Sequence, residues 1–133
     1  MRSVIVSVAL GVSLLLGQRF SLAHHSFAAY FDGEKPVTLT GKVAGIEWTN
    51  PHFHFTIDVD NGGAVERWRF EGYPPNMLVR QGWKRDETLM EGVTVTVEGW
   101  AARSEPNAGA ARWVTLADGR KLAAGPPAGT GGR

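Results

Sequence analysis

Hydrophobic and polar residues alternate with a period of two over much of the chain, as they do in strands with one buried face. In residues 52–60 the apolar side chains occupy every second position: Phe53, Phe55, Ile57 and Val59. Similar alternation predicts further strands over residues 36–48, 64–72, 93–101 and 111–122. The turn Asn61-Gly62-Gly63 joins two of these strands as a hairpin, so we expect neighbouring strands to pair antiparallel.

The first predicted strand contains a change of phase. Its apolar positions are odd-numbered as far as Val43 and even-numbered from Ile46 onward. The change falls at Ala44-Gly45, and a one-residue slip beside a glycine is typical of a β-bulge or a sharp bend. We therefore predict that this strand bends near Gly45.

One segment between the strands departs from the period of two. In residues 73–83, Pro75 suits the first turn of a helix and Gly82 suits the position just after its end. Asp118-Gly119 forms a turn that closes a small hairpin near the end of the last strand. The fold class predicted from this order is mainly β. We expect an OB-like, five-stranded antiparallel barrel or sheet with one short helix between strands three and four. A twisted open sheet crossed by one helix is the alternative.

The first 23 residues have the features of a secretory signal peptide. A basic start is followed by an uncharged apolar run over residues 4–17 and by the small-x-small triplet Ser21-Leu22-Ala23. The apolar run is shorter than the roughly 20 residues that span a bilayer, although a membrane anchor or a buried first helix is the alternative. We expect cleavage after Ala23, periplasmic or secreted localisation, and no stable membrane anchor afterwards. Residues 24–122 form the predicted β-rich domain, and residues 123–133 form a predicted disordered Gly/Pro-rich tail.

The charge balance of the chain changes with that cleavage. The sequence holds 14 basic and 13 acidic residues, and Arg2 and Arg19 would leave with the signal peptide. The mature chain then carries 12 basic and 13 acidic residues, a net charge of −1 with neutral histidines. A balance so close to zero does not favour nucleic-acid binding, so we expect no nucleic-acid partner.

The four histidines of the chain are the best candidates for chemistry: His24, His25, His52 and His54. His52 and His54 share one face of a predicted strand, opposite its aromatic residues, so two imidazoles can approach one metal ion. Cleavage after Ala23 would free the α-amine of His24, which can chelate a metal together with its own imidazole. Amine and imidazole nitrogens suit copper, with Cu(II) preferred, or zinc. The chain contains no cysteine, which excludes disulfides and thiolate ligands.

The same histidines can also be interpreted without any metal-binding role. His52 and His54 can be ordinary solvated strand histidines, and His24 and His25 an exposed chain start. No arrangement of acid, base and nucleophile is recognisable, so we expect a binding protein rather than an enzyme. Trp100 follows the outward phase of its strand and is the candidate for an exposed aromatic contact. The alternative function is therefore a structural or protein-interaction module of the cell envelope, with an envelope protein as partner and no metal.

Several segments resemble one family of exported bacterial proteins. They are "AHHSFAAYFD", "PVTLTGKVAGIEWTNPHFHFTIDV", "WRFEGYPPNMLVRQGW" and "VTVEGWAAR" with "ARWVTLADGRKL", which together cover nearly all of the predicted mature chain. The sequence is similar in these segments to domain of unknown function 6152. The resemblance implies an exported, single-domain, mostly β protein without an established activity. It places the family's paired histidines at His24 and His25 and its turn histidine at His52, whereas a different residue is common at the position of His54.

Overall fold

The computed structural model describes residues 27–127 of the chain. A helical turn over residues 27–30 leads directly into the first strand. The elements that follow are β1 (Phe31–Glu47), β2 (His54–Asn61), β3 (Ala64–Glu71), α2 (Pro75–Arg80), β4 (Thr94–Ala102), β5 (Ala108–Thr115) and β6 (Lys121–Ala123). The mainly β class and the short helix between the third and fourth strands are confirmed.

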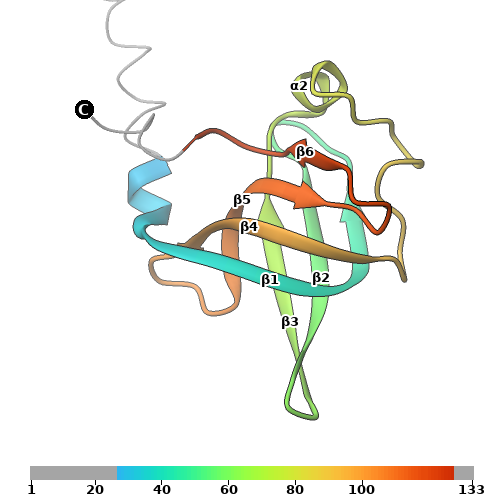
Figure 1. Ribbon diagram of the computed structural model, residues 1–133. Coiled ribbons are helices and arrows are strands. Elements are labelled where there is room, and N and C mark those ends of the chain that lie inside the picture. The colour runs from blue at the N-terminus through green and yellow to red at the C-terminus, as the bar shows by residue number, and fades with distance from the viewer. Residues whose placement is uncertain (1–26, 128–133) are drawn as a thin grey trace, which may run out of the picture.

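The strands form one sheet in the order β3-β2-β1-β4-β5-β6, and an additional pairing of β3 with β5 joins five of them into a ring (Figure 1). All pairings are antiparallel except β3 with β5, which run parallel over Arg69–Glu71 and Ala108–Ala110. The order of the five ring strands and the position of the helix are those of an OB-type topology. The sixth strand is the second arm of the small hairpin predicted at Asp118-Gly119, where it pairs with β5.

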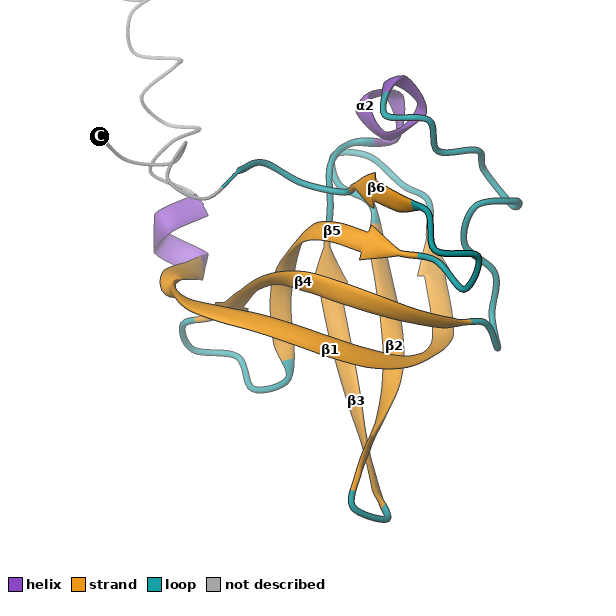
Figure 2. Ribbon diagram, viewed as in Figure 1, coloured by secondary structure: helices purple, strands orange, loops and turns teal. Residues whose placement is uncertain are grey.

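The long strand β1 takes part in both sides of the ring (Figure 2). Its first part pairs with β4, its last part pairs with β2, and the register with β2 shifts between Val43 and Gly45. This is the predicted bulge, and it lets one strand turn from one neighbour to the next. The turn also needs Gly41, because a Cβ there would lie 2.5 Å from the carbonyl oxygen of Asp58.

The core consists of the apolar residues that alternate along the ring strands, together with residues of the helix and the loop after it. Phe53, Phe55 and Ile57 are at most 1% exposed, as the alternation predicts. Trp83, just after α2, is also buried and donates a hydrogen bond from its indole nitrogen to the carbonyl of Ala123 at 2.8 Å. Burying each large apolar side chain contributes roughly 1.5–3 kcal/mol to the stability of the ring.

The packed chain continues beyond residue 122, where the sequence predicted the end of the domain. Ala123 is the last residue of β6, and Ala124 is fully buried. The amide of Ala124 donates to the carbonyl of Arg112, and its carbonyl accepts from the amide of Tyr73. A Cβ on Gly125 would clash with the carbonyl oxygen of Ala111. At Ala124 and Gly125 the small residues that suggested a tail are required by close packing, since larger side chains would not fit.

The predicted signal peptide, His24, His25 and residues 128–133 lie outside the described residues. Between residues 27 and 127, the model contains no helix that is both long and apolar enough to cross a membrane.

Candidate functional site

His52 and His54 lie on either side of one carboxylate. The Nδ1 atom of His52 is 2.8 Å from Oε1 of Glu71, and the Nε2 atom of His54 is 3.6 Å from Oε2 of the same residue. The first distance is within hydrogen-bonding range, whereas the second is a longer electrostatic contact. The structure therefore brings the two described histidines together through Glu71.

Local structure explains why these three side chains meet. His54 and Glu71 are directly opposite partners in the β2–β3 ladder. His52 precedes β2 by two residues, and Phe53 between the two histidines is fully buried. The amide of Phe53 donates to the carbonyl of Tyr73, and its carbonyl accepts from the amide of Gly72. With Phe53 directed into the core, the histidines on either side of it project away from the core, toward Glu71.

The two histidines differ in their exposure. The side chain of His52 is 46% exposed, and that of His54 is 18% exposed. Burial lowers the pKa of His54 below its ordinary value, and the neighbouring Arg69 cation lowers it further. The carboxylates of Glu71 and Glu47 oppose this shift without reversing it. The lowered pKa favours the neutral form of the His54 imidazole.

His52 and Glu71 also line a cavity of about 610 Å³ at one end of the ring. It lies where β3 ends and β5 begins, and its walls include four aromatic residues: Phe27, Tyr30, Phe31 and Tyr73. We call it the aromatic cavity. Three of these residues belong to the helical turn and the first residue of β1, so the described chain begins in the wall of the same cavity as His52.

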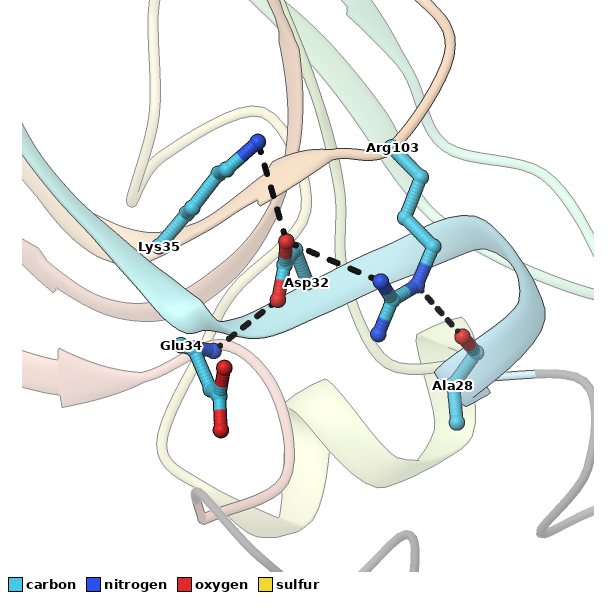
Figure 3. Close-up of polar contacts among 5 residues, drawn as sticks. All are labelled: Ala28, Asp32, Glu34, Lys35 and Arg103. Carbon is cyan, nitrogen blue, oxygen red and sulfur yellow. Dashed lines mark hydrogen bonds and ion pairs between the residues drawn. The ribbon is translucent and has the colours of Figure 1, made fainter.

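The helical turn is attached to the end of β4 by Arg103 and Asp32 (Figure 3). The Arg103 guanidinium donates a hydrogen bond to the carbonyl of Ala28 at 2.7 Å and lies 3.6 Å from the carboxylate of Asp32. The backbone amide of Arg103 donates to the carbonyl of Tyr30 at 2.9 Å. These contacts hold the beginning of the described chain beside the aromatic cavity.

The comparisons with known proteins identify a family. Residues 13–111 match the model of a family of unknown function, DUF6152. The chain belongs to this family. Among solved structures, the chain is similar to Rim1, a mitochondrial single-stranded DNA-binding protein of S. cerevisiae, with 12% sequence identity and a TM-score of 0.48. That match covers 62% of this chain and 93% of Rim1. No curated protein matches the sequence.

The metal ligands predicted for this DUF6152 protein are only partly described. His52 and His54 lie on one side of the β2 segment, as predicted, and share Glu71, whereas His24 and His25 lie outside the described residues. Only His52 of the two lines the aromatic cavity. Within residues 27–127 no group of three or more His, Asp, Glu or Cys side chains is arranged to hold a metal ion. A metal site at His52 would therefore need ligands from the residues before Phe27.

The prediction that Trp100 is an exposed aromatic contact is wrong. Its side chain is only 6% exposed, although it lies outside the main core cluster. The ring of Phe27 packs edge-on against Trp100, with ring centroids 5.9 Å apart. Trp100 lies outside the main core cluster, as its place in the strand predicts, but the helical turn at residues 27–30 covers it. Trp100 was the contact residue predicted for the alternative function as an interaction module, and its burial removes that support.

Three residues of the site were missed by the sequence reasoning. Glu71 is one of several acidic residues on the predicted strands, and no local pattern distinguishes it. The two-residue turn Gly62-Gly63 fixes the hairpin register that places it opposite His54. Tyr73 follows β3, where the alternation stops. Arg103 acts on Ala28, which lies 75 residues away, and no local pattern predicts such a contact.

Proposed function

We propose that this protein is exported and binds a metal ion without catalysing a reaction. The site consists of His52 together with His24 and its free α-amine, with His25 and His54 as further nitrogen donors. Cu(II) is the preferred ion because amine and imidazole nitrogens suit its tetragonal geometry, and Zn(II) binds less tightly to the same ligands.

One observation carries the proposal: the beginning of the described chain and His52 line the same cavity. Each residue extends a chain by at most about 3.6 Å, so His25 starts within roughly 7 Å of Phe27 and His24 within roughly 11 Å. The Arg103 contacts hold the helical turn beside that cavity. The proposal requires that this short connection lets His24 and His25 reach the His52 imidazole.

The contact between His52 and Glu71 supports the same proposal. A proton on Nδ1 directed at the Glu71 carboxylate, 2.8 Å away, leaves Nε2 with a free lone pair for a metal. Carboxylates that orient a ligating histidine in this way are a regular feature of metal sites. Glu71 would then orient the imidazole and would not itself be a ligand.

The test compares two forms of the N-terminus. The protein is exported to the periplasm of a Gram-negative host, and its intact mass shows whether it begins at His24. Cu(II) is titrated against a competing chelator, in parallel with a form that carries one extra alanine before His24. The extra residue retains every histidine and moves only the α-amine, so we expect clearly weaker binding of Cu(II). Equal affinities would refute the role of the α-amine.

His52→Ala and His54→Ala provide the second comparison. We expect the larger loss of Cu(II) affinity from His52→Ala, because only His52 lines the aromatic cavity. If neither substitution changes the affinity, any copper that binds is held elsewhere and the proposed site is wrong. Repeating the titration with Zn(II) measures the preference between the two ions.

A further inference from the structure

The aromatic side chains of the aromatic cavity are not ligands in the metal proposal. Phe27, Tyr30, Phe31 and Tyr73 all line the cavity. Its volume of about 610 Å³ falls within the range of pockets that hold small organic ligands, about 300–1,000 Å³. The side chain of Tyr30 remains 68% exposed, so this part of the wall is accessible from solvent. The cavity is therefore larger and more aromatic than a metal ion alone requires.

The charged residues of the lining favour a cation. Glu71 and Glu105 are its two carboxylates, and Arg69 is its one Arg or Lys side chain. The Arg69 guanidinium lies 3.6 Å from the carboxylate of Glu47, which is outside the lining, so its charge is already partly compensated. For Glu105 the described part of the chain shows no ion pair. The lining therefore carries more negative than positive charge.

We propose that the aromatic cavity binds a small organic ammonium ion. The faces of aromatic rings attract cations, and a methylated ammonium group combines a positive charge with an apolar surface that such a wall accommodates. The carboxylates of Glu105 and Glu71 in the cavity lining add electrostatic attraction for the ammonium group. A small carboxylate or phosphate ligand would instead meet these two acidic groups. The proposal requires no metal, since the aromatic wall and Glu105 are not metal ligands.

The experiment compares two probes of nearly equal shape, choline and its uncharged isostere 3,3-dimethylbutan-1-ol. Each is titrated into the exported protein in the presence of EDTA, and binding is followed by NMR shifts of the tyrosine rings and by calorimetry. We expect choline to bind at least roughly tenfold more tightly, because only choline carries the charge that the rings and carboxylates attract. Equal binding of the two probes, or no binding of choline, would overturn the proposal.

Substitutions at Tyr30 separate the aromatic contribution from general packing. Tyr30 is exposed, so its replacement should leave the fold intact. We expect Tyr30→Leu to weaken choline binding roughly three- to tenfold and Tyr30→Phe to retain it, since phenylalanine keeps the ring face. Equal effects of the two variants would contradict a cation–π contact at this residue.

Two charge variants complete the test. Glu105→Gln should weaken choline binding and leave the uncharged isostere unaffected. Glu87→Gln is the matched control, because Glu87 pairs with Lys84 in the loop after α2, away from the cavity lining. Choline is titrated in the presence of EDTA and Cu(II) is titrated without choline, so failure of one proposal is distinguishable from failure of the other. Identical results for Glu105→Gln and Glu87→Gln would show that the carboxylate at the cavity has no role.

Discussion

Two pairs of an acidic and a basic residue in the β2–β3 ladder differ in how completely their groups satisfy one another. Asp58 faces Arg67, and four residues earlier on β2 His54 faces Glu71. Arg67 donates two hydrogen bonds to the Asp58 carboxylate, at 2.7 and 2.9 Å, so each group of this pair satisfies the other. At the other pair, Glu71 is shared between two imidazoles. The Asp58–Arg67 pair is satisfied within itself. The two histidines that share Glu71 keep ring nitrogens that can bind a metal.

The difference arises from what packs around each end of the ladder. Asp58 lies opposite Lys42 of β1, and Arg67 is 64% exposed. Glu71 lies where β3 pairs with β5 and borders the aromatic cavity. The same alternation of residues therefore produces an exposed ion pair at Asp58 and Arg67 and a candidate site at His54 and Glu71. The two pairs differ because residues from distant parts of the chain, such as those of β5, pack beside Glu71.

The largest effect is expected from Trp100→Ala, which removes the support beneath the helical turn at the cavity end. Deleting a buried tryptophan side chain costs roughly 3–5 kcal/mol, and Phe27 would lose its edge-on contact with the ring. Urea unfolding measures the loss. An exposed tryptophan would give almost no change, so a variant as stable as the wild type would contradict the observed burial.

Substitution of the two carboxylates compares the pairs directly. We expect Glu71→Gln to weaken Cu(II) binding by about 10- to 100-fold, the usual effect of losing a carboxylate that orients a ligating histidine. Asp58→Asn changes the same charge on the same hairpin and should leave copper affinity unchanged. Competition titrations of both variants provide the measurement. A similar loss in both would mean that only the overall charge matters.

Arg103→Ala tests whether attachment of the helical turn positions the N-terminal ligands. The substitution removes the hydrogen bond to Ala28 and the contact with Asp32. Such a bond contributes about 0.5–1.5 kcal/mol, so Cu(II) affinity should fall by no more than about tenfold. Arg120→Ala is the matched control, since Arg120 makes a comparable contact with Asp118 in the β5–β6 turn. Unchanged affinity in Arg103→Ala would show that the turn does not position the site.

The smallest expected effect is a difference between the two pairs in how stability depends on pH. Because the pKa of His54 is lowered in the folded protein, the unfolded chain takes up a proton first as pH falls below about 6.5, and stability decreases there. The pKa of Asp58 is also lowered, by its hydrogen bonds with Arg67, so its contribution is lost only near and below pH 3.8. Urea midpoints measured with EDTA should show that His54→Gln flattens the profile as the pH falls below about 6.5. The same slope in wild type and variant would contradict this assignment.

Much of the ring could be predicted from the sequence because its strands are locally patterned. The alternation around Phe53 and Phe55 gave the buried face, and the phase change at Gly45 gave the bulge in β1. Pro75 and Gly82 marked the helix because their backbone preferences fit its two ends. The candidate site was less predictable. Two histidines were placed on one side, but their shared partner depends on the pairing of two strands.

The sequence by itself determined which residues face the core, where the chain turns and which side chains can ligate a metal. These properties follow from periods of two, from glycine and proline geometry and from side-chain chemistry, all of which are local. Only the tertiary structure decided that Trp100 is covered, that Ala124 is packed inside, and that Phe27 and His52 border one cavity. Those outcomes depend on contacts between residues far apart in the chain, such as Arg103 with Ala28, which no local pattern specifies.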